Sequence, residues 1–264
     1  MLKIAITGAS GRMGRMLIDA TLNAKDMQLA AALAPEGDSC IGEDAGQGIG
    51  RQTHVLVSSD LSNASNCDVL IDFTRPAGTL RHLEFCRANK IAMVIGTTGF
   101  ASNEVALIGE AAKDIPIVFA PNMSVGVNVT LKLVEIAAKL LSDYDCEIVE
   151  MHHRHKVDAP SGTALEMGRR VAYARGQNFE DVALLSREGH TGEREQPTIG
   201  FASLRGGDVV GDHTVIFANT GERIEISHKS GSRAGYANGS LAAARFLSTK
   251  NSGLYSMSDV LGLQ

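Results

Sequence analysis

The sequence predicts an α/β protein in which a doubly wound parallel sheet domain is joined to an α+β domain with an open mixed sheet. Apolar runs of strand length alternate with helical patterns up to about residue 120. A glycine-rich turn directly follows the first apolar run. After about residue 124 the pattern changes to longer helices and to strands joined by tight turns. Apolar strands that alternate with helices are typical of a parallel sheet covered on both faces.

The first half supplies the strands of that sheet. The run LKIAIT (2–7) is a buried strand candidate, and GRMGRMLIDATLNA (11–24) has apolar residues at helical spacing. Further strands are expected at 27–33, 54–59, 68–74, 91–98 and 115–122. Helices between the later strands are expected at 76–90 and 102–113.

The second half predicts a different organisation. We expect helices at 124–144, 161–176 and 236–248, and strands at 146–155 and within 199–230. The pairs Gly206–Gly207 and Thr220–Gly221 indicate tight turns between the last strands. The polar stretch SREGHTGEREQPT (186–198) is typical of an exposed loop.

Composition excludes several classes of protein. The 264 residues include 30 acidic and 25 basic side chains, so the chain lacks the basic field of a nucleic-acid-binding protein. No apolar run has the length of a membrane span, and the N-terminal stretch does not predict a signal peptide. The four cysteines form no C-x-x-C pair and are expected to be buried thiols in a reducing compartment rather than scattered disulfides. We therefore expect a soluble, cytoplasmic protein.

The stretch ITGASGRMG carries a possible dinucleotide-binding turn. Gly8, Gly11 and Gly14 follow a strand and open a helix, which is the context of a Rossmann-like phosphate-binding motif. Glycines allow the backbone to approach a pyrophosphate, and the free N–H groups of the helix then hold the phosphates. The alternative is an ordinary turn between a strand and a helix.

The preference between NADH and NADPH stays open. An acid that binds the ribose hydroxyls is expected about 20 residues after the motif, yet Ala34 and Pro35 stand there. Glu36 and Asp38 are near, in an uncertain register. Arg12 is a candidate for contact with a 2′-phosphate or with the adenine, or else is a plain surface residue.

Two later strand ends are candidates for the rest of the cofactor site. The stretches GTTG (96–99) and APNMS (120–124) come where parallel strands are expected to end. Ligands of open α/β sheets bind outside the carboxyl ends of the strands. Small and hydroxyl side chains there suit a nicotinamide and its ribose, although simple turns have the same composition.

The stretch EMHHRHKVDAPSGTA (150–164) concentrates cationic and titratable side chains, which suggests a metal site, a nucleic-acid patch or a pocket for a small anion. Alternation along a regular strand places His152 and His153 on opposite faces, which argues against one metal bound by all three histidines. No Cys or carboxylate stands at ligand spacing. Nucleic acid is disfavoured because the protein is acidic and only 5% aromatic.

An anion pocket fits this stretch best. Lys156 supplies a positive charge, and Ser161 is the expected N-cap of a helix that begins with Gly162 and Thr163. The N–H groups of that first turn can bind a carboxylate. A histidine and a lysine beside such a site provide charge neutralisation and proton transfer. The alternative is a solvated strand end next to a capped helix.

A set of longer stretches carries a resemblance to a known family. These stretches are GASGRMGR, DFTRPAGTLRHLEFC, VIGTTGF, EMHHRHKVDAPSGTA, SREGHTGER and GERIEISHKSGSR. They closely resemble the 4-hydroxy-tetrahydrodipicolinate reductase (dihydrodipicolinate reductase) family of bacterial lysine and diaminopimelate biosynthesis. The resemblance continues to SGLYSMSDVLGL near the C-terminus.

The resemblance implies an NADH- or NADPH-dependent oxidoreductase that is a homotetramer, with no metal and a small dicarboxylate as its substrate. It also implies a dinucleotide-binding domain at 1–124 and 234–264, and a substrate-binding and oligomerisation domain at 125–233.

The resemblance assigns roles to individual residues. His152 would be the general acid and Lys156 its catalytic partner. The substrate carboxylates would contact His153, Lys156, Gly162 and Thr163. The cofactor would contact Gly8, Ala9, Ser10, Gly11, Arg12, Met13, Gly96, Thr97, Thr98, Ala120, Pro121, Asn122 and Met123. Arg154 and His155 are expected to be structural.

Two positions depart from the family pattern. Some members have Glu-Arg where this chain has Ala34-Pro35, and many have phenylalanine in place of Met123. The first departure leaves cofactor preference unsettled. Methionine can fill the space of a phenylalanine, so we expect no loss of activity from the second.

The resemblance also implies a reaction, to which there are two alternative functions. After loss of its 4-hydroxyl group, the cyclic substrate would accept a hydride at ring C4 and a proton from His152, with Lys156 assisting. One rival is an NAD(P)-dependent oxidoreductase for another small acid, which a panel of substrates would separate. The other is a non-catalytic NAD(P)H-sensing protein, which would not require the titratable cluster.

Overall fold

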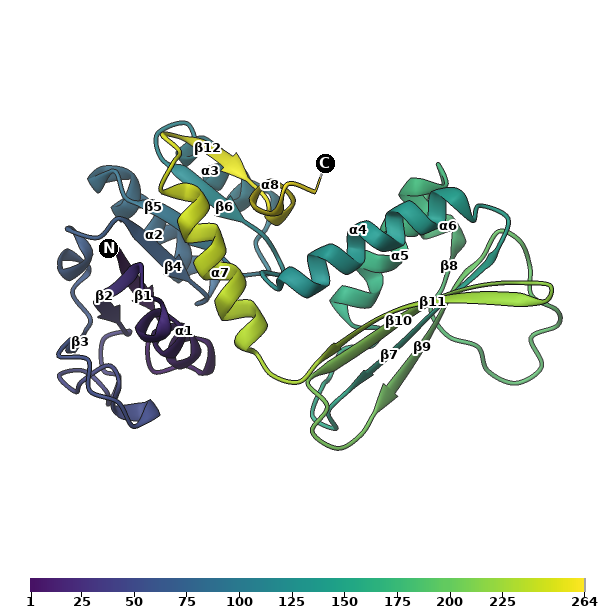
Figure 1. The fold of residues 1–264 in the computed structure, drawn as a ribbon, viewed down its shortest axis with the longest axis horizontal. Helices are drawn as coiled ribbons and strands as arrows, with labels where there is room; N and C mark the ends of the chain where they lie inside the picture. The colour runs from purple at the N-terminus through teal and green to yellow at the C-terminus, as the bar shows by residue number, and fades with distance from the viewer. Residues whose placement is uncertain (264) are drawn as a thin grey trace. The chain divides into compact units, whose positions relative to one another are not determined.

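The structure, a computed structural model, describes residues 1–263 as two compact units (Figure 1). One unit contains residues 1–125 together with the C-terminal segment from Arg233, and the other contains residues 126–232. Among the described residues, no helix combines the length and the apolar character needed to cross a bilayer.

The first unit is built on a seven-stranded parallel sheet. The strand order is β12-β6-β5-β4-β1-β2-β3, which contains the 3-2-1-4-5-6 order of a doubly wound dinucleotide-binding sheet. The strands are β1 (Leu2–Thr7), β2 (Met27–Leu33), β3 (Val57–Ser58), β4 (Val69–Asp72), β5 (Ala92–Ile95), β6 (Pro116–Phe119) and β12 (Gly253–Tyr255). The helices are α1 (Arg12–Asn23), α2 (Pro76–Asn89), α3 (Ser102–Ala111), α7 (Ala234–Leu247) and α8 (Met257–Leu261), with 3-10 turns η1 (Gln47–Ile49) and η2 (Leu61–Ala64).

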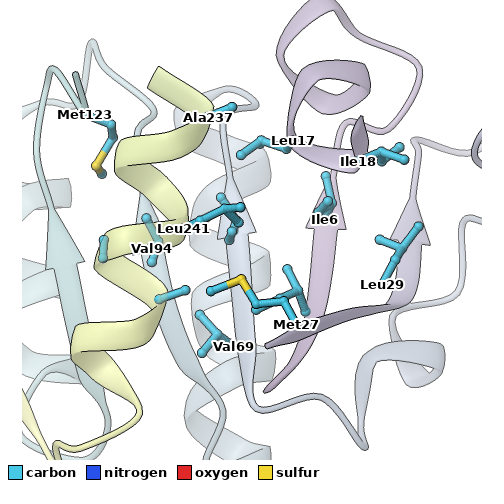
Figure 2. Close-up of a cluster of buried hydrophobic side chains, with 14 of the residues drawn as sticks. Ile6, Leu17, Ile18, Met27, Leu29, Val69, Val94, Met123, Ala237 and Leu241 are labelled. Carbon is cyan, nitrogen blue, oxygen red and sulfur yellow. The ribbon is translucent and has the colours of Figure 1, made fainter. Parts of the chain in front are cut away.

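Both faces of this sheet are buried because successive strand residues point to opposite sides. Ile4 and Ile6 pack on the side of α1 and α7, whereas Ala5 between them packs on the side of α2 and α3. Figure 2 shows the first of these cores, where Leu241 of α7 lies over the strands. Helix α7, near the C-terminus, therefore covers a sheet whose strand β1 is formed by the first residues of the chain.

The second unit has a mixed five-stranded sheet in the order β11-β10-β7-β9-β8. Its central strand β7 pairs antiparallel with β10 and parallel with β9. The strands are β7 (Asp145–His152), β8 (Ala183–Leu184), β9 (Ile199–Arg205), β10 (Gly211–Asn219) and β11 (Glu222–Ser230). The helices are α4 (Val125–Leu140), α5 (Gly162–Ala174) and α6 (Phe179–Val182). Apolar residues of α4 and α5 pack on one face of the sheet around Ile148, Val215 and Phe217.

The predicted fold class is confirmed: the chain has a Rossmann-like parallel sheet and a second, mixed sheet. The strands predicted at 54–59, 68–74, 91–98 and 115–122 were too long. The third strand shrinks to Val57–Ser58, because the preceding residues close a loop on the Asp44 carboxylate, which accepts bonds from the N–H groups of Thr53 and His54. The tail also adds β12 and α8, which the sequence did not predict.

The strand predicted at 146–155 is wrong beyond His152. Past that residue the backbone bonds leave the ladder. The N–H of His153 donates to the Val209 carbonyl at 2.7 Å, and the N–H of Lys156 turns back to the His153 carbonyl at 3.1 Å. The alternation argument therefore applies to Glu150 and His152 but not to His153 and His155, which lie in the following loop with their ring centroids 6.1 Å apart.

Candidate functional site

The first unit contains a cavity of about 760 Å³ at the carboxyl ends of its strands. Its walls come from the glycine turn after β1, from the chain after β2, and from the first turns of α2 after β4. β1 and β4 are neighbours, and the strand order reverses direction between them. Such a switch point is the usual ligand site of an open α/β sheet.

The glycine turn has the geometry that a pyrophosphate requires. Gly8 adopts φ +65°, a left-handed conformation that favours glycine. The Gly11 N–H closes the turn on the Gly8 carbonyl at 2.9 Å. A Cβ at Gly14 would overlap the same carbonyl, so this glycine lets α1 pack against the turn. The N-cap of α1 is Gly11, which has no side chain to cap the helix, so the N–H groups of the first turn suit a phosphate.

A buried carboxylate joins the ends of β4 and β5. Asp72 is fully buried, and its Oδ1 accepts bonds from the hydroxyls of Thr74, Thr79 and Thr97 at 2.8–2.9 Å. Its other oxygen contacts Nδ1 of His82. Burial acts to raise the pKa of Asp72, but the His82 contact and the other hydrogen bonds outweigh it, so this pKa lies below its usual value. The cluster fixes Thr97, a predicted cofactor residue, at the sheet edge.

The other predicted cofactor residues fall into three groups. Gly8, Ser10 and Gly11 line the cavity. The exposed residues among the rest are Arg12, Thr98 and Pro121, with Met13, Gly96 and Asn122 partly exposed. The buried ones besides Thr97 are Ala9, Ala120 and Met123. The Met123 side chain lies in the core of the sheet and packs near α7 (Figure 2), so it is committed to packing.

The arginines that line the cavity are not the one that the sequence suggested. Asp38 accepts a bond from the Ser10 hydroxyl at 2.7 Å, and this bond and that from the Cys40 N–H lower its pKa. Arg12 is not among the lining residues, whereas Arg75 and Arg81 on the α2 side are. These two arginines could not be chosen from the sequence, because their approach to the chain after β2 depends on the fold.

The second unit places His152 at the end of the central strand β7. Its Nδ1 lies 2.6 Å from Oε2 of Glu150, a side chain that is 1% exposed. Arg205 donates from both terminal nitrogens to the two Glu150 oxygens, at 2.8 Å each. Burial acts to raise the pKa of Glu150, but the bonds from Arg205 and His152 outweigh it and hold this pKa below its usual value.

Lys156 and the start of α5 lie in the chain that follows β7. The Lys156 ammonium is held by both oxygens of Asp158, at 2.7 and 2.9 Å, and this bond lowers the pKa of Asp158. Ser161 caps α5 as predicted, because its Oγ accepts the Ala164 N–H at 3.2 Å. Gly162 is exposed and Thr163 half-buried at the first turn.

The remaining basic residues of this segment differ in their exposure to solvent. Arg154 and His155 are exposed. His153 is half-buried, and its Nδ1 is enclosed without a hydrogen-bond partner among the described residues. Within residues 1–263, no group of three or more His, Cys, Asp or Glu side chains is placed to hold a metal ion.

His213 is a close neighbour of His152 that sequence reasoning missed. It lies on β10 directly opposite Glu150, and its ring packs edge-on against His152 with centroids 5.1 Å apart. Its Nε2 lies 2.8 Å from the Ser161 hydroxyl. Burial lowers the pKa of His213 to about 4, with the nearby His152 as the next cause, so this ring is neutral at pH 7.

Glu150 and Arg205 were also missed as site residues. Period-two alternation does place Glu150 on the face of His152. Arg205 is brought there only by the parallel pairing of β7 with β9, in which it lies opposite His152. That register leaves no local signal in the sequence.

The fold and cavity of the first unit define a Rossmann-type nucleotide-binding protein with a second, mixed-sheet unit. Two family models match: dihydrodipicolinate reductase, N-terminus, over residues 2–123, and dihydrodipicolinate reductase, C-terminus, over residues 126–261. The chain belongs to the dihydrodipicolinate reductase family.

Curated relatives support this family over the full length. A 4-hydroxy-tetrahydrodipicolinate reductase from Nitrosomonas eutropha is 57% identical, covering 100% of this chain and 99% of the relative. One from Herminiimonas arsenicoxydans is 59% identical with the same coverage. Among solved structures, dipicolinate-bound dihydrodipicolinate reductase from Paenisporosarcina sp. TG-14 matches with a TM-score of 0.79 and 25% identity, covering 98% of this chain and 99% of that one.

The lowered pKa of His213 predicts a specific loss of stability in mild acid. Between pH 6.5 and about 4, the unfolded chain binds a proton on His213 that the folded chain does not. The free energy of unfolding should therefore fall as the pH falls, with His213 contributing about 3 kcal/mol of that decrease.

Urea unfolding of the wild type and of His213→Gln between pH 7.5 and 4 tests this expectation. Glutamine does not titrate and can keep a bond to Ser161. The difference between the two proteins removes the contributions of other groups, including His228, whose pKa burial also lowers. Parallel pH dependences for the two proteins would contradict the assignment.

Proposed function

We propose that this protein catalyses the NAD(P)H-dependent reduction of 4-hydroxy-tetrahydrodipicolinate to tetrahydrodipicolinate, in lysine and diaminopimelate biosynthesis. The observation that carries the proposal is the pairing of His152 with a buried carboxylate, next in the chain to Lys156 and the first turn of α5. The names of the full-length relatives and the dipicolinate bound to the similar solved structure support it.

The substrate is a ring with two carboxylates, and the segment after β7 offers groups that bind carboxylates. We assign its contacts to His153, Lys156 and the N–H groups of Gly162 and Thr163. N–H groups at a helix N-terminus attract anions, and an ammonium group adds a charge-assisted hydrogen bond. Lys156 would exchange its intramolecular partner, Asp158, for the substrate.

The proton of the reaction is assigned to His152. When bound, a reduced nicotinamide supplies the hydride that reaches ring C4 after the substrate has lost its 4-hydroxyl group as water. The enamine formed in this way is basic at the neighbouring carbon. His152 protonates that carbon, and the Lys156 charge stabilises the negative charge on the substrate during the transfer.

The cofactor contacts are assigned to the first unit. The turn from Gly8 to Met13 would hold the pyrophosphate, and the segments 96–98 and 120–123 would line the nicotinamide part. The left-handed Gly8 and the uncapped start of α1 support this assignment. The four cysteines are free thiols, which is consistent with the reducing cytoplasm.

The first prediction from the proposed function concerns Lys156. Lys156→Ala should lower kcat by about a hundredfold or more, because it removes a charge that stabilises the transition state. The measurement is oxidation of NADPH with 4-hydroxy-tetrahydrodipicolinate generated in the assay. His155→Ala, in the same loop, is the matched control and should retain turnover.

Near-normal turnover of Lys156→Ala would contradict the assignment of this residue. Tight NADPH binding by a wild type that reduces neither this substrate nor other small acids would favour the sensing protein instead. Unfolding measurements on both variants show whether a loss of turnover reflects a loss of structure.

The second prediction concerns cofactor preference. Arg75 and Arg81 line the cavity together with Ala34 and Pro35, and among residues 1–263 neither guanidinium forms an ion pair. We assign them to the 2′-phosphate of NADPH, in place of an arginine after β2. Arg81→Ala should raise the Kd for NADPH about tenfold, the equivalent of one lost contact of about 1.4 kcal/mol, and leave that for NADH nearly unchanged.

Fluorescence titrations with NADH and NADPH side by side measure this preference. Arg87→Ala is the control, because Arg87 lies near the far end of α2 and pairs with Asp114. Equal changes in the affinity for both cofactors would show that Arg81 does not contact the 2′-phosphate.

The third prediction is that the protein is a homotetramer assembled through the second sheet. One face of this sheet packs on α4 and α5, whereas the opposite face carries the half-buried Val149 and Met151 and the 46% exposed Leu204.

Light scattering after gel filtration should give four times the chain mass. Leu204→Glu should give smaller species, and Leu107→Glu, on α3 and 52% exposed, should not. A monomeric wild type would contradict the proposal.

A further inference from the structure

The Glu150 carboxylate accepts hydrogen bonds from several groups, and only one of these groups is a catalytic candidate. Arg205 forms a two-bond fork with it, and the Ser161 N–H donates to Oε1 at 3.2 Å. These bonds hold both carboxylate oxygens in place independently of His152. The carboxylate is therefore a rigid acceptor placed 2.6 Å from His152 Nδ1.

The charge of this acceptor determines the tautomer of His152. An ionised carboxylate can only accept hydrogen bonds, so the Nδ1 of His152 must carry a proton. The lowered pKa of Glu150 keeps it ionised at neutral pH. Nε2 is then the nitrogen that gains and loses a proton.

We propose that Glu150, braced by Arg205, is a positioning residue that fixes the ring of His152 so that only Nε2 delivers the proton of the reaction. This inference rests on the proposed function. In the step itself, the Nε2–H bond breaks as the C–H bond of the product forms. Neutral His152 keeps Nδ1–H on Glu150 and regains a proton at Nε2 from solvent.

The surroundings of Nε2 agree with this assignment. Gly211 is buried at the start of β10, and a Cβ there would lie 2.9 Å from Nε2. The backbone of Gly211 is not left-handed, so space for the imidazole is what the glycine provides. A side chain at this position would crowd the reactive nitrogen or push the ring away from Glu150.

Arg205 also links the two catalytic candidates. The same Nη2 that contacts Glu150 donates to the Asp158 carbonyl at 2.6 Å, and the Asp158 carboxylate holds Lys156. One guanidinium therefore braces both the acceptor of His152 and the loop that carries Lys156. Its side chain is only 21% exposed, so the brace is partly desolvated and its bonds are correspondingly strong.

The charged and titratable groups around His152 come from each neighbouring element. They are Glu150 on β7, Arg205 on β9, the neutral His213 on β10 and Lys156 in the following loop. Glu150 is the acidic member of this set that bonds to the ring. Replacing it by glutamine removes the negative charge and leaves the Arg205 charge facing the imidazole, and both changes disfavour imidazolium.

Glu150→Gln is the direct test, carried out on the full-length protein with NADPH and 4-hydroxy-tetrahydrodipicolinate. We expect kcat to fall by about a hundredfold. The alkaline limb of the kcat/KM profile should also move to lower pH by about one unit or more, because a nearby opposite charge has been lost. A purely structural role of Glu150 would reduce the amount of active protein without moving the limb.

Two further variants complete the set. Glu147→Gln is the matched control, because Glu147 lies on the opposite face of β7 and accepts a similar two-bond fork from Arg187; it should keep the wild-type limb. Arg205→Lys retains the charge but not the fork, so it should lower kcat and leave the limb near its wild-type position. A Glu150→Gln protein that matches Glu147→Gln in kcat and in pH profile would overturn the proposal.

Nitrogen NMR of labelled histidine rings, assigned with His152→Asn, provides a readout that does not require turnover. Wild-type His152 should show a protonated Nδ1 in its neutral form, and a neutral form protonated at Nε2 would overturn the proposal even if Glu150→Gln fails to fold. A wild type with the expected tautomer but no reductase activity would refute the proposed function and leave the positioning of His152 intact.

Discussion

A carboxylate removed from water must be compensated by hydrogen bonds and opposite charge, because the effective cost of burying an ion is several kcal/mol. Each unit of this protein carries such a group near the end of its central strand: Asp72 on β4 and Glu150 on β7. Neither side chain is more than 1% exposed. The residues that satisfy these two carboxylates are also those that shape the two candidate binding regions.

The two carboxylates are compensated by different chemistry. Asp72 receives three threonine hydroxyls from the chain after β4, from α2 and from the chain after β5, with His82 beside it. It thus ties loops together at the edge of the first sheet. Glu150 is neutralised by one guanidinium and bonds an imidazole. The first arrangement stiffens a cavity wall and the second orients a titratable ring.

The local parts of this design could be predicted from the sequence. The strands at 2–7 and 27–33 match the observed ones, because long apolar runs between glycine or charged residues specify buried parallel strands. The turn at Gly8 and the cap at Ser161 were predicted because each depends on residues within a few positions. His152 and Lys156 could be selected as candidates because both belong to the cationic stretch HHRHK (152–156).

The non-local parts could not be predicted. Arg205 and Glu150 are 55 residues apart and meet because β9 pairs parallel to β7 in one particular register. Strand periodicity shows which residues share a face but not which strand lies alongside. The end of β7 at His152 depends in the same way on the chain at 206–210, which takes the backbone bonds of the next residues. The pairing of β12 with β6 is likewise non-local, because it joins residues 253–255 to residues 116–118.

Two imidazoles, those of His152 and His213, pack edge to face in the second unit. Nδ1 of His152 bonds the Glu150 carboxylate, which orients the ring. His213 faces the Ser161 hydroxyl instead, and burial lowers its pKa to about 4. Because His213 stays neutral, it adds no repulsion to a proton on its neighbour. The sheet register places Glu150 directly opposite His213 on the adjacent strand, yet the Glu150 carboxylate bonds the ring of His152, so the two imidazoles differ in their hydrogen-bond partners.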